Sequence, residues 1–133
     1  MIPLAFEMPL RTATGCNNRE HHFARASRVK RERAMTAGHL VTQGYFRQHE
    51  IMRALPLRIT LTRVSPRAKW LPLKRCWQSC DDDAVPPALK GVRDEIANWI
   101  ELDDGDERLF FHYAQDKGPR LAVRVRIESE VSP

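Results

Sequence analysis

The chain has 133 residues, 42% of them hydrophobic, which suffices for one domain with a single core, and no apolar run reaches the roughly 18 residues of a membrane span. The N-terminal apolar stretch is short and contains Glu7, unlike a signal peptide, so we expect a cytoplasmic protein with no membrane partner. The three cysteines disfavour a disulfide framework, so we expect reduced thiols. Charge is polarised: residues 1–80 hold 15 Lys and Arg against 4 Asp and Glu (+11), and residues 81–133 hold 7 against 13 (−6), which together give the net +5.

The first half of the chain is expected to begin with a strand and a helical segment. Residues from about 4 to 10 favour a strand, and the turn-forming residues 12–18 favour a loop. Residues from about 18 to 49 favour helix, and Gly38 and Gly44 predict an interruption, so two helices fit here.

A second strand and an insertion follow. Apolar and polar side chains alternate over residues 55–66, which predicts a half-buried strand. Residues 67–80 have no clear period and break at Pro72, so we expect an irregular basic insertion. Its two tryptophans, Trp70 and Trp77, either stack on unpaired bases or cover apolar surface.

The last third predicts a helix and two strands. Pro86 and Pro87 suit the first turn of a helix, and apolar residues recur on one face until about Glu101. Strands are expected from about 108 to 115 and from about 121 to 127, joined as an antiparallel hairpin. The prediction is therefore one α+β domain over residues 1–133, a small mixed or antiparallel sheet covered by helices, in the order β-α-β-α-β-β.

Carboxylates gather at both ends of the predicted helix, with Asp81, Asp82 and Asp83 before it and Asp103, Asp104 and Asp106 after it. They suit either a divalent cation or, without a metal, helix capping by Asp83 and an exposed turn. A helix of about 15 residues spans roughly 22 Å, so the two ends share an ion only if the chain folds back or the helix is shorter.

The basic half of the chain suits a polyanion such as nucleic acid. The cations of the predicted first helix could track phosphates, although a solvated helix explains them equally: Arg25, Arg28, Lys30, Arg31 and Arg33. A zinc site from His21, His22, Cys76 and Cys80 is only weakly indicated, because no second Cys pair exists.

The run from Asp81 to Glu128 resembles the C-terminal half of the RusA-like crossover junction endodeoxyribonucleases of phage and prophage type. The matching residues are the triple Asp at 81–83, Lys90 four residues before Asp94, and Asp103-Asp104 before the closing strands. The N-terminal strand, Asn-rich loop and basic helix resemble the same family.

The resemblance implies a homodimer that binds branched DNA and resolves four-way (Holliday) junctions by paired nicks with Mg²⁺ or Mn²⁺. It assigns metal-binding catalytic roles to Asp81, Asp83 and Asp104, with Lys90 as the catalytic lysine and Asp82 and Asp103 as register rivals. Asn18 and Arg19 match the family's Asn-rich segment, which implies contact with DNA, although Asn17 or Asn18 serves equally as a helix cap.

Two departures from the family pattern keep a second function open. Ala84 stands where the family has Asn, and Val85, Pro86 and Pro87 stand where it has Leu and small residues. The alternative is a DNA-binding protein of the same fold that does not cut. Without the resemblance, Lys90 would be read as an ordinary exposed helix lysine.

Overall fold

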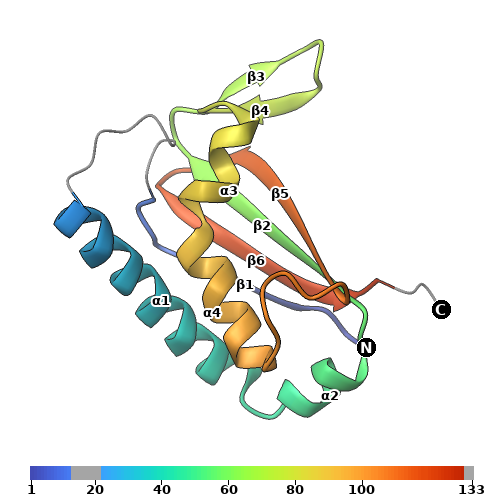
Figure 1. Ribbon diagram of the computed structural model, residues 1–133. Helices are drawn as coiled ribbons and strands as arrows, with labels where there is room; N and C mark the ends of the chain where they lie inside the picture. The colour runs from blue at the N-terminus through green and yellow to red at the C-terminus, as the bar shows by residue number, and fades with distance from the viewer. Residues whose placement is uncertain (13–21, 131–133) are drawn as a thin grey trace.

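The computed structural model describes residues 1–12 and 22–130, in which a four-stranded sheet carries helices on one face (Figure 1). The strand order in this sheet is β1-β6-β2-β5. A second sheet has two strands, β3 and β4. In chain order the elements are β1 (Leu4–Met8), α1 (His22–Gly44), α2 (Gln48–Arg53), β2 (Leu57–Ser65), β3 (Lys69–Leu71), β4 (Cys76–Gln78), the 3-10 helix η1 (Asp82–Ala84), α3 (Val85–Ala88), α4 (Lys90–Ile100), β5 (Leu109–Lys117) and β6 (Ala122–Ser129).

The four-stranded sheet is mixed, which confirms the predicted α+β class. β6 is antiparallel to both β1 and β2, whereas β2 and β5 run parallel. Alternation sets the two faces: Leu57, Ile59 and Leu61 of β2 are fully buried, while Arg58 between them is exposed. The core therefore lies between the sheet and the helices.

The long helices α1 and α4 lie side by side over one face of the sheet (Figure 1). The predicted apolar stripe is present, because Val92, Ile96 and Ile100 of α4 are all fully buried. Gly91 permits the close approach of the two helices, since a Cβ there would lie 2.9 Å from the Glu32 carboxylate of α1.

The predicted antiparallel hairpin of the last two strands is wrong. β5 and β6 are not neighbours, because β2 lies between them and pairs with both. Between β5 and β6 the chain must pass the end of β2. There the N–H of Gly118 donates to the carbonyl oxygen of Ser65 at 3.4 Å. A Cβ on Gly118 would lie only 2.5 Å from Val64 Cγ1, so any larger residue here would force the crossing or Val64 to shift.

Replacing Gly118 with Ala is therefore expected to lower the free energy of unfolding by roughly 1–3 kcal/mol, because the new methyl group forces the β2 end or the crossing to shift. Urea unfolding followed by circular dichroism measures this. Gly105→Ala is the matched control, since nothing lies within 4 Å of a Cβ at that position. Equal stability of the two variants would contradict this account of the crossing.

The predicted helical segments are divided differently from expectation. The segment expected to begin at Pro86 is in fact η1, α3 and α4, with a break at Leu89 between the last two. In the N-terminal half, α1 continues through Gly38 and ends at Gly44, so only the second glycine marks an end. The predicted loop and the caps Asn17 and Asn18 lie outside the described residues.

The insertion at 67–80 is not irregular. β3 and β4 pair antiparallel, with Trp70 opposite Trp77, and form a hairpin that projects beyond the end of the main sheet (Figure 1). Three-residue strands are too short to show a period of two, which is why alternation did not reveal them. We call residues 67–78 the arm.

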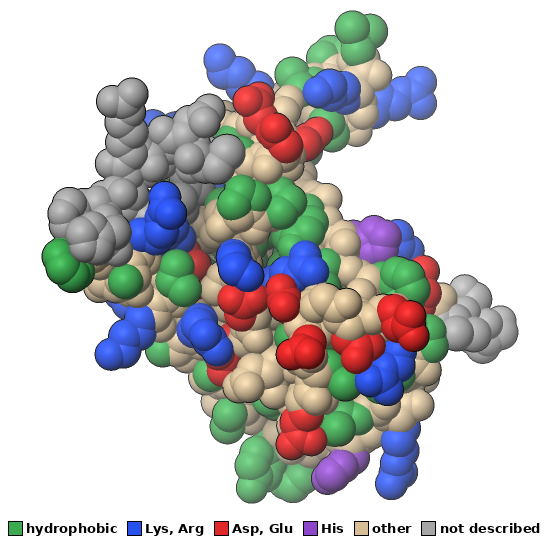
Figure 2. Space-filling view, in the orientation of Figure 1, with side chains coloured by type: hydrophobic (Ala, Val, Ile, Leu, Met, Phe, Trp, Pro, Cys, Tyr) green, Lys and Arg blue, Asp and Glu red, His purple; other side chains and the backbone are tan. Residues whose placement is uncertain are grey.

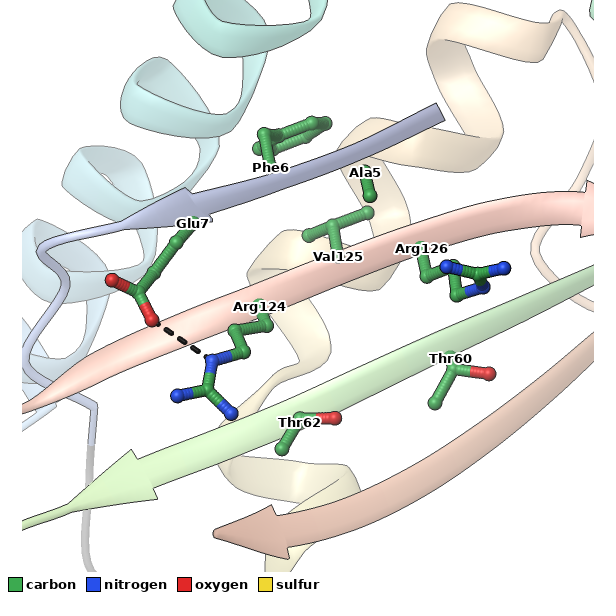
Figure 3. A pocket seen from close by; sticks show the side chains of 8 residues that line it. All are labelled: Ala5, Phe6, Glu7, Thr60, Thr62, Arg124, Val125 and Arg126. Atoms are coloured by element: carbon green, nitrogen blue, oxygen red, sulfur yellow. Dashed lines mark hydrogen bonds and ion pairs between the residues drawn. The ribbon is translucent and has the colours of Figure 1, made fainter. Parts of the chain in front are cut away.

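The face of the sheet opposite the helices is polar, and the charged side chains that β1 and β6 place on it are paired. A shallow pocket of about 370 Å³ on it is lined by β1, β2 and β6. Arg124 reaches across to Glu7 with 2.9 Å between Nε and Oε1 (Figure 3), and its other end pairs with Asp116. Arg126 pairs with Glu128. These pairs leave no unpaired cation lining this pocket among the described residues.

Within residues 1–12 and 22–130, no helix has both the length and the apolar character to span a bilayer.

Candidate functional site

A polar pocket on the helical face brings together several of the residues singled out from the sequence. Its volume is about 300 Å³. Its walls come from α1, α4 and the turn between α4 and β5, and the lining residues are Arg33, Lys90, Asp94, Ala97, Asn98, Leu102, Asp103 and Asp104.

The turn after α4 brings Asp104 back toward the start of that helix. Lys90, the first residue of α4, has its Nζ 3.3 Å from Asp94 Oδ1 and 3.9 Å from Asp104 Oδ2. The 11 residues of α4 span roughly 16 Å, so Asp104 cannot be this near without reversing direction. The chain therefore folds back after α4, and the helix is also shorter than the roughly 15 residues expected, so both conditions for bringing Asp104 to the helix start are met.

The reversal starts at Glu101, which takes the left-handed conformation with φ 66° and donates its N–H to the carbonyl oxygens of Ala97 and Asn98. This conformation is uncommon for a residue with a side chain. Gly105, in the same turn, does not adopt a positive φ, so the glycine is not the residue that reverses the chain.

Arg93 holds Asp104 in this position. Its guanidinium pairs with Asp104 Oδ2 at 3.3 Å and donates a 2.8 Å hydrogen bond to the backbone oxygen of the same residue. It also donates to the Tyr113 hydroxyl at 3.0 Å and stacks on the Phe111 ring at 4.4 Å. Sequence reasoning missed Arg93, although its position three residues after Lys90, on the same helical face, was a usable signal.

Lys90 is held only weakly. Its side chain is 65% exposed, and its two carboxylate partners are 27% and 41% exposed. Ion pairs at such exposure are typically worth about 0–1 kcal/mol, because water and salt screen them. The ammonium group can therefore leave these partners for a stronger anion at little cost.

The first acidic cluster lies between the arm and α3. Gln115 of β5 accepts hydrogen bonds from the backbone N–H groups of Ser79 and Cys80 and donates to Asp82 Oδ1 at 3.0 Å. The side chains of Asp81 and Asp83 are exposed and make no hydrogen bond or ion pair within the described part of the chain. Capping by Asp83 is absent, because Ala84 occupies the N-cap position of α3.

The two acidic clusters do not form a ready-made metal site. Across residues 1–12 and 22–130, no three His, Cys, Asp or Glu side chains are close enough together to hold one ion. Asp81 and Asp83 are thus not assembled with Asp104 as these side chains stand. The donor chemistry itself, exposed carboxylate oxygens, is what Mg²⁺ and Mn²⁺ prefer.

The weakly indicated zinc site gains little from the described cysteines. Burial raises the pKa of the Cys80 thiol, and the positive charge of Arg63 opposes this only in part. A raised thiol pKa disfavours the thiolate that zinc binds. His21 lies outside the described residues.

The predicted DNA-contacting cations fall into two groups. Arg25, Lys30 and Arg31 of α1 are exposed and have no ion-pair partner among the described residues. Arg28 pairs with the buried Glu32, and Arg33 pairs with Glu95 at 3.1 Å. Asn18 and Arg19 lie outside the described residues. Figure 2 shows Lys and Arg side chains along α1 and on the arm, with Asp and Glu side chains between them.

Comparisons with protein-family models, with curated proteins and with solved structures found no match.

Proposed function

We propose that this protein is a metal-dependent endonuclease that cuts phosphodiester bonds in branched DNA, including four-way junctions. The observation that carries the proposal is the return of Asp104 to Lys90 at the start of α4, in a pocket beside the basic helix α1. The resemblance of the Asp81–Glu128 run to RusA-like nucleases supports the same activity. A symmetric junction needs two such sites, and a homodimer supplies them.

Each residue of the proposed site has a distinct role. Lys90 exchanges its weak carboxylate partners for an oxygen of the DNA phosphate and offsets the negative charge that develops there. Arg93 keeps the Asp104 carboxylate directed toward Lys90. Asp81, Asp83 and Asp104 are the residues that would hold the metal, and this requires their exposed carboxylates to approach one another. A bound Mg²⁺ or Mn²⁺ supplies charge screening at the phosphate and a lower pKa for its bound water.

The second candidate is DNA binding without cutting. It is favoured by the separation of the acidic clusters in the described part of the chain and by the buried Ala84 at the position of the family's Asn. Both candidates use the same cationic surface, so binding alone does not distinguish them.

A nicking assay separates the two functions. A labelled synthetic four-way junction is incubated with the protein in Mg²⁺, in Mn²⁺ or in EDTA, and the strands are resolved on a denaturing gel. The proposal predicts symmetric nicks near the branch point with either metal and none in EDTA, and no cutting of a linear duplex of the same sequence. An intact junction that the protein nevertheless binds would favour the second candidate.

Binding to DNA is expected to depend steeply on salt. If about six cations each meet a phosphate, log K falls with log salt at a slope near −5. The variant Lys30→Gln/Arg31→Gln is expected to reduce the steepness by about 2, because two contacts on α1 are lost. The control Arg53→Gln/Arg58→Gln removes two exposed cations that lie outside α1, in α2 and β2, and is expected to keep the slope. A wild-type slope near zero would remove the proposed DNA partner.

A further inference from the structure

The arm is a charged, aromatic projection whose side chains do little for the core. Leu73 at its tip is fully exposed and Trp70 is 48% exposed. The Trp70 and Trp77 rings meet edge to face at 5.4 Å, and Lys117 lies 5.5 Å from the Trp77 ring centre. The arm contains no acidic residue and four cations, namely Arg67, Lys69, Lys74 and Arg75.

None of the four cations of the arm has an ion-pair partner in the part of the chain that the structure describes. Arg25, Lys30 and Arg31 of α1 share this property, whereas Arg33, Arg93 and Arg124 are paired with carboxylates. Unpaired cations beside an exposed aromatic ring are complementary to a nucleic-acid strand, whose phosphates are negative and whose bases present flat apolar faces.

The base of the arm is fixed to the main sheet. Ala68 is buried, and its N–H donates to the Ser65 oxygen at the end of β2 at 3.3 Å. Directly after β4, Ser79 donates its N–H to the side-chain oxygen of Gln115 of β5 at 2.9 Å. The arm therefore has a defined direction relative to Asp81 and Asp83, which follow it directly in the chain.

We propose that the arm enters the branch point of DNA, where Trp70 stacks on an unpaired base and Lys74 and Arg75 contact the adjoining phosphates. Leu73 at the tip acts as an apolar wedge against the exposed base step. This inference rests on the proposed action on branched DNA and adds the element that recognises the branch. It assigns selection of branched over linear DNA to the arm and general phosphate binding to α1.

Binding of a labelled four-way junction and of a linear duplex, measured by fluorescence anisotropy at fixed salt, tests this assignment. Trp70→Ala is expected to weaken junction binding by about 5- to 100-fold, the range for losing one base stack, and to change duplex binding little. Phe46→Ala removes another exposed aromatic ring, 90% exposed in the α1–α2 connection, and is expected to bind as the wild type does.

The contribution of the arm's positive charges is tested with the same binding assay. Lys74→Gln/Arg75→Gln is expected to weaken junction binding by roughly 10- to 30-fold at 0.15 M salt, through two lost phosphate contacts. Arg53→Gln/Arg58→Gln is the matched control, and circular dichroism checks that every variant is folded. All these side chains are exposed, so folding is expected to be unaffected.

Failure of this inference is distinct from failure of the proposed function. If the arm variants bind the junction as tightly as wild type while Lys30→Gln/Arg31→Gln loses binding, the arm proposal is overturned and the DNA partner stands. If the wild-type protein binds neither the four-way junction nor the linear duplex, the arm proposal and the proposed function are both overturned. Loss of binding to phosphatidylserine vesicles in the arm variants, with DNA binding unchanged, would instead identify the arm as a membrane-contacting element.

Discussion

Replacing Asp104 with Asn is expected to lower the rate of junction cutting by about 10²- to 10³-fold while leaving junction binding nearly unchanged. Asn keeps the shape of the side chain but removes the negative charge that a divalent cation requires. Losing one well-placed electrostatic group at a reaction centre typically raises the barrier by about 3–4 kcal/mol. Single-turnover cutting rates with saturating protein separate this effect from any change in affinity.

Asp106→Asn is the matched control for Asp104→Asn. It lies in the same turn, but its carboxylate is committed to Arg108, which holds the pKa of Asp106 down at about 2 through hydrogen bonds of 2.9 and 3.0 Å. This variant is expected to cut at close to the wild-type rate. Equal losses in both variants would show that removing any acid from the turn is harmful, and would argue against a specific role for Asp104.

Replacing Ile59 with Ala is expected to lower the free energy of unfolding by about 2–5 kcal/mol. Ile59 is fully buried in β2, the strand that pairs with both β5 and β6, and its side chain belongs to the core under α1 and α4. A loss of this size is a large part of the roughly 5–15 kcal/mol that stabilises a typical domain. Urea denaturation at constant temperature measures it from the midpoint and slope.

The neighbouring Thr60→Ala supplies the control for the core prediction. Thr60 faces the opposite side of the sheet, is only partly buried and lines the shallow pocket of the polar face. Its replacement is expected to cost less than about 1 kcal/mol. A similar loss for Thr60→Ala and Ile59→Ala would contradict the assignment of the two faces.

Local patterns in the sequence were sufficient for most elements of the fold. Alternation over β2 and the helical spacing of Val92, Ile96 and Ile100 predicted their buried faces, because these periods reflect contacts within one element. The strand order was not predictable in this way. Proximity along the chain favours a hairpin of β5 and β6, whereas in the structure β2 lies between them and the chain passes its end with Gly118 close to Val64.

The candidate site shows the same division between local and distant information. Lys90 and Asp94 are one helical turn apart, so their 3.3 Å contact follows from spacing alone. The approach of Asp104 depends on the left-handed conformation of Glu101 and on the contacts of Arg93. Neither a glutamate nor an arginine at these positions predicts such a chain reversal from sequence alone. The arm was missed because its strands have three residues each.

The separation of the two acidic clusters gives the nuclease proposal its sharpest consequence. If Asp83 and Asp104 come to hold one ion when DNA is bound, removing either carboxylate disables the same site, and removing both adds little more. If they act separately, or not at all, their effects are independent. Affinity for the junction is expected to change little in either variant.

The most direct measurement is therefore a double-mutant cycle of junction cutting in Mg²⁺, with wild type, Asp83→Asn, Asp104→Asn and the combined variant. The account predicts a wild-type rate that each single replacement lowers by at least about 100-fold and that the double replacement lowers little further. An uncut junction with wild type, or losses that multiply in the double variant, would contradict it.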